Sequence, residues 1–165
     1  MLSRLGIQKK LLSNCSLLLS FQIMPGIERE GTLPPHPAIS VVIIPRNEGA
    51  ELRAAVTNVI ETLPREQREL IVVDDGSTDD STAFLAELPE VRIFRAAELG
   101  VARARNYGAD RATGDVILFA DAHVRAPAGW YEPFCEVLRD ECVGAVAPGI
   151  YSLSAPECRA VSAWM

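Results

Sequence analysis

Three short polar clusters contain the residue types that could bind a ligand. They are Pro45-Arg46-Asn47-Glu48, Asp74-Asp75-Gly76-Ser77 and Asp121-Ala122-His123, and each follows a short apolar run. A single cluster of this kind is as well explained by turn chemistry, because Asp, Asn and Ser bond their own backbone in loops. Three such clusters at the ends of three predicted strands favour a shared site, since open α/β sheets bind ligands beyond the carboxyl ends of their strands.

Asp121 and His123 are the candidate metal ligands. They are two positions apart, so in an extended segment their side chains point to the same side. A carboxylate and an imidazole so placed can hold a divalent cation, with a bound diphosphate completing its shell. The oxygen ligands suit Mg²⁺ or Mn²⁺, and the imidazole shifts the choice toward Mn²⁺. The alternative is a histidine that bonds the backbone of a polar turn.

A predicted helix over residues 100–112 is cationic near its start. Arg103 and Asn106 lie three positions apart and share a helix face. The start of a helix, together with an arginine, is a favourable place for a phosphate or an orienting carboxylate. The alternative is a solvated basic face whose arginines pair with nearby aspartates.

Alternating apolar runs and helical patterns position these residues. The predicted strands cover residues 39–44, 70–73, 91–95, 115–120 and 142–147, and the predicted helices cover 48–62, 79–88, 100–112 and 130–140. Strands that alternate with helices through short connections are typical of a doubly wound, mostly parallel sheet. We therefore expect an α/β fold for the main domain, which begins near Ala38.

Residues 1–37 differ from the rest of the chain. Basic residues precede an apolar run from Leu11 to Met24, as in a signal peptide, but no small-residue cleavage site follows. The run is also shorter than the roughly 20 residues that span a bilayer. We expect a poorly ordered extension or a short apolar helix, followed by a Pro-rich linker. Peripheral association with a membrane is the alternative.

Composition and missing motifs exclude several classes of protein. The formal charge of −6 and the lack of a basic stripe argue against a nucleic-acid partner. Lysine occurs only at Lys9 and Lys10, so neither a P-loop nor the late lysine of a receiver-like signalling domain is present. No G-x-G-x-x-G or G-x-S-x-G motif occurs, and the four cysteines have no C-x-x-C spacing. A cytoplasmic location is expected, with the inner face of the membrane as an alternative.

Four stretches of the chain resemble, in order and spacing, the motifs of family 2 glycosyltransferases. They are Ile39-Ser-Val-Val-Ile-Ile-Pro-Arg-Asn-Glu48, Ile71-Val-Val-Asp-Asp-Gly-Ser-Thr-Asp-Asp80, Gly100-Val-Ala-Arg-Ala-Arg-Asn-Tyr-Gly108 and Gly114-Asp-Val-Ile-Leu-Phe-Ala-Asp-Ala-His123. The resemblance covers about Ala38 to Pro148. It implies the GT-A fold, a Rossmann-like half that binds a nucleotide sugar.

The resemblance also implies roles for individual residues. Pro45, Asn47 and Glu48 would line the nucleoside pocket, Asp75 with Asp74 would hold the base or ribose, Arg103 and Asn106 would shape the donor pocket, Asp121 would meet the ribose or sugar, and His123 would bind the metal. The implied reaction is metal-assisted transfer of a sugar from a nucleoside diphosphate, with a UDP-sugar favoured. The acceptor would be a hydroxyl group of a glycan, a lipid or a protein.

Two departures from the family pattern matter. The family usually has D-x-D where this chain has Asp121-Ala122-His123. A D-x-H occurs in the polypeptide N-acetylgalactosaminyltransferases, which resemble this half. In those enzymes a later histidine also binds the metal, and no histidine follows His123 here.

The second departure concerns the acceptor side. Family members continue well beyond this point to build the acceptor site, and inverting members take their catalytic base from that region. We therefore expect residues 38–150 to be the donor-binding domain and residues 151–165 to begin a truncated acceptor-side region. No catalytic base is assigned in this chain. The alternative is a catalytically inactive module for nucleotide-sugar binding or assembly.

Overall fold

A computed structural model of the chain describes residues 22–25 and 32–148. The chain divides into two compact units, one of residues 33–131 and one of residues 1–32 with 132–165. The predictions for residues 1–21, 26–31 and 149–165 lie outside the described residues. The unit of residues 33–131 contains all three polar clusters.

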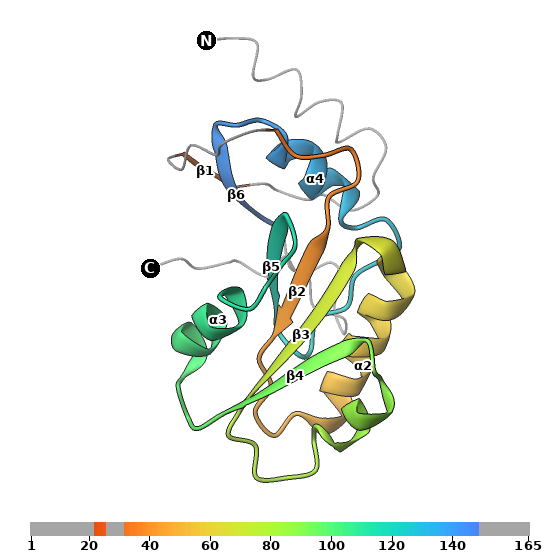
Figure 1. Cartoon of the computed structure of the whole chain (residues 1–165), viewed down its shortest axis with the longest axis vertical. Coiled ribbons are helices and arrows are strands. Elements are labelled where there is room, and N and C mark those ends of the chain that lie inside the picture. The colour runs from red at the N-terminus through yellow and green to blue at the C-terminus, as the bar shows by residue number, and fades with distance from the viewer. Residues whose placement is uncertain (1–21, 26–31, 149–165) are drawn as a thin grey trace, which may run out of the picture. The chain divides into compact units, whose positions relative to one another are not determined.

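A four-stranded sheet with the order β4-β3-β2-β5 forms the centre of this unit (Figure 1). Its strands are β2 (Ile39–Ile43), β3 (Arg68–Asp75), β4 (Val91–Ala96) and β5 (Val116–Ala120). Every strand pairing in it is parallel. The prediction of a doubly wound, mostly parallel α/β sheet is confirmed.

Two helices cover opposite faces of the sheet. Helix α2 (Gly49–Thr62) links β2 to β3, and α3 (Val101–Ala109) links β4 to β5, which lies on the other side of β2. The connection from β2 to β3 and the connection from β4 to β5 run in opposite directions across the sheet. Because both connections are right-handed, their helices lie on opposite faces. Burial on both faces explains why the middle of β3, Leu70–Val73, is continuously apolar and why β2 is apolar except for Ser40. Both strands are almost wholly buried.

Helix α3 packs very closely against β2 and β3. Ala104 of the helix lies in one core cluster with Val42, Ile71 and Val73. Gly108 lies one helical turn further on, where an added Cβ atom would come within 2.4 Å of Val42 Cγ1. The small residues of α3 therefore allow the helix to approach the sheet.

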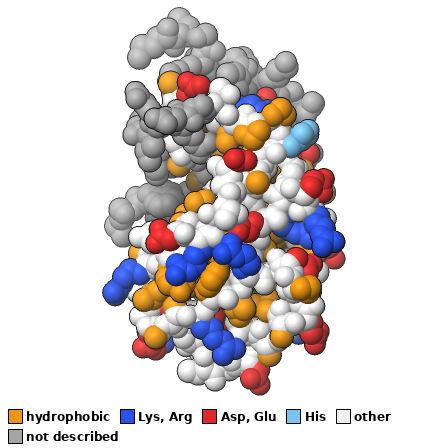
Figure 2. Space-filling model, in the orientation of Figure 1, with side chains coloured by type: hydrophobic (Ala, Val, Ile, Leu, Met, Phe, Trp, Pro, Cys, Tyr) orange, Lys and Arg blue, Asp and Glu red, His pale blue; other side chains and the backbone are white. Residues whose placement is uncertain are grey.

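The same face of the sheet is open over β5. Phe119 pairs in register with Val42 and so shares its face, yet Phe119 is 45% exposed and Ile117 is 41% exposed. On the face shown in Figure 2, hydrophobic side chains are interspersed with acidic and basic ones. Among the described residues, α3 covers this face over β2 and β3 and leaves Ile117 and Phe119 of β5 partly exposed.

Three predicted helices are shorter than the sequence pattern indicated, and one of them is the helix predicted over residues 130–140, which covers only Glu132–Leu138. Within residues 79–88 only a 3₁₀ segment, η2 (Ala83–Glu87), forms, because the Asp79 carboxylate accepts the Ser81 N–H at 3.1 Å and keeps the chain in a turn. The helix predicted over 100–112 ends at Ala109. Beyond it, the Arg111 N–H bonds the carbonyl three positions back, at Gly108. A second 3₁₀ segment, η1 (Arg65–Gln67), precedes β3.

The second unit contains helix α4 (Glu132–Leu138) and strands β1 (Gln22–Pro25) and β6 (Val143–Ala147). The predicted last strand is therefore present. It pairs antiparallel with β1, in a separate two-stranded sheet. Strand β1 lies within the N-terminal range that we expected to be poorly ordered or helical. No described helix is long and apolar enough to cross a membrane.

The topology predicts a ligand-binding crevice at the carboxyl ends of β2 and β5. The chain leaves β2 toward β3 and returns to β5 on the opposite side of β2. In doubly wound sheets such a reversal opens a crevice between the two loops, where ligands bind. The loops that follow β2 and β5 carry Glu48 and His123.

Candidate functional site

Asn47 holds the loop after β2 to the loop after β3. It adopts a left-handed backbone conformation with φ of 57°, which Asn tolerates better than most residues. Its N–H donates to Ser77 Oγ at 3.0 Å, and its Oδ1 accepts the Thr78 N–H at 2.8 Å. The buried Pro45 adds a third link, because its carbonyl accepts the Asp75 N–H at 3.2 Å.

The acidic pair of β3 is buried and hydrogen-bonded to the protein. Asp74, which is 5% exposed, accepts the Ser77 N–H on Oδ1 at 2.9 Å and so closes the turn through Gly76. Asp75, which is 4% exposed, accepts the N–H groups of Leu99 at 2.6 Å and Gly100 at 2.9 Å. Both carboxylates therefore fix the loops at the carboxyl ends of the strands. Their contact with a base or ribose stays a prediction. Such a contact would have to use the lone pairs of these oxygens that the protein's own N–H groups leave free.

The segment with Asp121 and His123 is a turn. The Val124 N–H bonds the Asp121 carbonyl at 3.1 Å, so Ala122 and His123 are the central residues of the turn. We expected an extended segment. The sequence is compatible with this turn, because Asp is favoured at its first position. Ala122 is only 1% exposed, whereas the side chains of Asp121 and His123 are 51% and 66% exposed.

Glu48 and His123 bring together the loops that follow β2 and β5. Glu48 Oε2 lies 3.9 Å from His123 Nδ1. The sequence predicted Glu48 for the nucleoside pocket and His123 for the metal, and the structure places the two side chains together. This contact joins the ends of β2 and β5 at the point where the sheet topology predicts ligand binding.

Arg105, which the sequence analysis did not select, reaches the site from α3. Its Nη2 lies 3.2 Å from Asp121 Oδ1, and its guanidinium carbon lies 6.0 Å from the centre of the Phe119 ring. Arg103 and Asn106, which were selected, are exposed on α3. The only sequence signal for Arg105 was the pair of small residues Ala104 and Gly108, which mark the side of α3 that packs on the sheet.

The metal-ligating side chains at this site suit a cation that is also coordinated by a bound phosphate ligand. Within residues 22–25 and 32–148 no group of three or more His, Cys, Asp or Glu side chains is placed to enclose a metal ion. Asp121 and His123 offer one carboxylate and one imidazole, both open to solvent. Such a pair fits Mn²⁺ or Mg²⁺ when a diphosphate and water supply the other ligands.

Comparison with known protein families identifies one family. The model of the family described as Glycosyl transferase family 2 matches residues 40–157. Human polypeptide N-acetylgalactosaminyltransferase 15 is 35% identical over 122 residues, which are 69% of this chain and 19% of that protein. The probable N-acetylgalactosaminyltransferase 6 of Caenorhabditis elegans is 40% identical over 116 residues, 64% of this chain and 19% of that protein. The chain thus spans about a fifth of the length of these relatives.

Solved structures show the same fold. A mannosyltransferase from Pyrobaculum calidifontis, in complex with GDP-Man and Mn²⁺, matches with a TM-score of 0.56 and 22% identity, over 81% of this chain and 38% of that one. TarS 1–349 of S. aureus matches with a TM-score of 0.55 and 19% identity, over 60% of this chain and 31% of that one. These likenesses support the GT-A assignment of the sheet and its helices.

Proposed function

The chain belongs to glycosyl transferase family 2, and from that premise we propose that it forms the donor-binding half of a metal-assisted glycosyltransferase. The observation that carries the proposal is the approach of Glu48 and His123 at 3.9 Å, from the two loops that border the crevice. Asp121 lies on the same turn as His123, with Arg105 beside it. One wall of the crevice thus offers carboxylate and imidazole ligands as well as a positive charge.

We propose a nucleoside diphosphate sugar as the ligand, and a uridine diphosphate sugar as the first to test. The curated relatives carry the name N-acetylgalactosaminyltransferase. The mannosyltransferase of the same fold was solved with GDP-Man and Mn²⁺, so a guanosine nucleotide is the second to test. The acceptor would be a hydroxyl group of a glycan, a lipid or a protein.

The chain's own residues have defined parts in donor binding. Asp121 and His123 would hold a divalent cation, which offsets the negative charge of the leaving diphosphate when it is bound. Arg105 orients the Asp121 carboxylate and adds positive charge near the diphosphate. Asn47 and Asp75 hold the surrounding loops in place, so that the crevice is formed before the donor arrives.

Calorimetric titration of the full chain with UDP and with GDP, each with and without Mn²⁺, tests the proposal. We expect one of the two nucleotides to bind with a dissociation constant in the micromolar range, corresponding to about −8 kcal/mol, and to bind more weakly without the metal. Binding of neither nucleotide would overturn the proposal. If a nucleotide binds, turnover of the matching sugar nucleotide separates an active enzyme from an inactive donor-binding module.

A further inference from the structure

The segment that follows the Asp121 turn runs along helix α2 from its first turn to its last. Three contacts join the two: Arg125 Nη2 to Glu51 Oε2 at 2.8 Å, a pair of hydrogen bonds between Ala126 and Asn58, and Trp130 Nε1 to Thr62 Oγ1 at 3.0 Å. Positions 51, 58 and 62 are separated by seven and four residues, so they form one stripe along the helix. This polar stripe of α2 lies outside the four stretches of sequence that resemble the family motifs.

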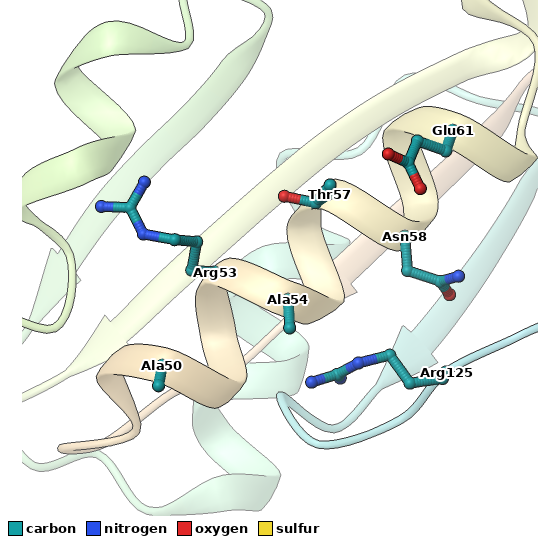
Figure 3. A pocket seen from close by; sticks show the side chains of 7 residues that line it. All are labelled: Ala50, Arg53, Ala54, Thr57, Asn58, Glu61 and Arg125. Carbon is teal, nitrogen blue, oxygen red and sulfur yellow. The ribbon is translucent and has the colours of Figure 1, made fainter.

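Asn58 bonds both backbone groups of one residue. The Ala126 N–H donates to Asn58 Oδ1 at 2.7 Å, and Asn58 Nδ2 donates to the Ala126 carbonyl at 3.0 Å. An amide side chain has an acceptor oxygen and a donor NH₂ group, so it can bind the N–H and the C=O of one residue, as a residue of a neighbouring antiparallel strand does. In Figure 3, Asn58 extends from α2 on the side where the segment bearing Arg125 passes. The segment is therefore fixed at one defined residue.

Arg125 extends this attachment back to the turn itself. Its Nη1 donates to the Val124 carbonyl at 2.9 Å and, more weakly, to the Ala122 carbonyl at 3.4 Å. Its Nη2 donates to the carboxylate of Glu51 at 2.8 Å and to the carbonyl of the same residue at 3.3 Å. The guanidinium thus connects the backbone on both sides of His123 to the first turn of α2.

His123 has little packing of its own to fix its direction. Its side chain is 66% exposed, and the Glu48 carboxylate is 3.9 Å away. The direction of its imidazole therefore depends on the backbone of the turn. Groups that hydrogen-bond to metal-ligating side chains commonly change metal affinity 10- to 100-fold when they are replaced. Asn58 and Arg125 act one step further away, on the backbone that carries His123.

We infer that Asn58 and Arg125 are positioning residues that hold the His123 turn against α2 and thereby set the metal-binding geometry. Neither residue contacts the donor or the cation in this assignment. The part that concerns the metal rests on the proposed function. The part that concerns the turn rests on the hydrogen bonds alone.

The test compares Asn58→Ala with Thr57→Ala in the full chain. Thr57 is the exposed neighbour of Asn58 on α2, so its replacement is a matched control. Two quantities are measured: hydrogen exchange of the Val124 amide, and the affinity for Mn²⁺ in the presence of UDP, read by electron paramagnetic resonance. UDP affinity in EDTA is measured alongside, because a general loss of folding would lower it too.

We expect Asn58→Ala to speed Val124 exchange about tenfold, since the turn loses its attachment to α2. We also expect it to weaken Mn²⁺ binding at least tenfold while leaving metal-free UDP affinity unchanged. Thr57→Ala should change none of the three. If Asn58→Ala does not fold, Arg125→Lys carries the test, because lysine can reach Glu51 but cannot reproduce the bonds to the carbonyls.

Equal effects of the two variants, or equal losses of metal-dependent and metal-free affinity, would overturn the inference. If the unaltered chain takes up neither Mn²⁺ nor a nucleotide, the proposed function fails. Val124 exchange then decides by itself whether Asn58 positions the turn, because that readout needs no ligand.

Discussion

Oδ2 of Asp75 accepts a 2.9 Å hydrogen bond from the backbone N–H of Gly100. Asp75 ends β3 and Gly100 directly precedes α3, so the bond joins the end of a strand to the start of a helix. Its other oxygen accepts the Leu99 N–H at 2.6 Å. A carboxylate at a helix start is also favoured by the helix dipole. Asp75 therefore stabilises the position of the helix that delivers Arg105 to the site.

Replacing Asp75 by Asn should lower the free energy of unfolding by about 2 kcal/mol. The amide keeps one acceptor, but its NH₂ group then faces a second backbone donor, and hydrogen bonds to charged groups contribute about 1.5–3 kcal/mol. Urea unfolding measures the change. Asp80→Asn, at an exposed position of the following loop, is the control. A change for Asp75→Asn no larger than for Asp80→Asn would contradict the anchoring role.

Gly108→Ala should destabilise the chain by about 1–3 kcal/mol, the usual range for an overpacked core. The new methyl group would lie 2.4 Å from Val42 Cγ1 and 3.2 Å from Val73 Cγ2, both in the buried core. Gly49→Ala is the matched control, because its Cβ would meet only ordinary contacts, at 3.7 Å or more. Thermal unfolding should show a lower midpoint for Gly108→Ala alone. Equal midpoints for the two variants would refute the close packing of α3 on β2.

Glu69 is the titrating group that links the amino-terminal ends of the strands. Burial acts to raise the pKa of its carboxyl, but hydrogen bonds from the Ser40 hydroxyl, the Thr113 backbone and Arg92 outweigh burial and lower the pKa below its ordinary value of 4.5. Because the folded-state pKa is lowered, the unfolded chain binds the proton more readily. The stabilisation is present above about pH 4.5 and is lost as the pH falls through the folded-state pKa.

Glu69→Gln should therefore cost about 2 kcal/mol of unfolding free energy near neutral pH. The difference from the unaltered chain should shrink as the pH falls below about 4.5. Denaturant unfolding across a pH series measures it. Glu66→Gln, at an exposed position ahead of β3, is the control. A difference for Glu69→Gln that is constant with pH would contradict the lowered pKa.

Arg105→Gln should weaken UDP binding about tenfold, because the change removes a charge-assisted contact beside the diphosphate site. Arg103→Gln should weaken UDP binding less than about twofold. The Arg103 side chain is exposed on α3, and Arg105 is the arginine that pairs with Asp121 at the proposed donor site. Fluorescence or calorimetric titration of both variants distinguishes the two arginines. A larger loss for Arg103→Gln would contradict the role of Arg105 and support Arg103 as the arginine of the donor pocket.

Local patterns were sufficient to predict the sheet and the places where the polar clusters emerge. The apolar runs at Ile39–Ile43 and Leu70–Val73 have no polar alternation, so burial on both faces follows from the sequence. Pairings between distant segments could not be predicted in this way. Strand β1 finds its partner β6 far along the chain, and the four residues of β1 have no strand pattern strong enough to identify them.

The candidate site was predicted in outline and changed in detail. The rotation of α3 decides that Arg105, and not Arg103, meets Asp121, and that rotation follows from tertiary packing at Gly108. The Asp121 turn depends on a hydrogen bond that an alternating pattern does not specify. The attachment of Ala126 to Asn58 joins two segments that show no relation in the sequence.

Replacement of the two histidines of the chain tests the account most directly. His123→Ala and His36→Ala are compared by titration with UDP in the presence and absence of Mn²⁺, His36 being exposed ahead of β2. We predict that His123→Ala abolishes most of the Mn²⁺-dependent gain in UDP affinity, while His36→Ala retains it. Equal retention of that gain in both variants would contradict a metal-assisted donor site between β2 and β5.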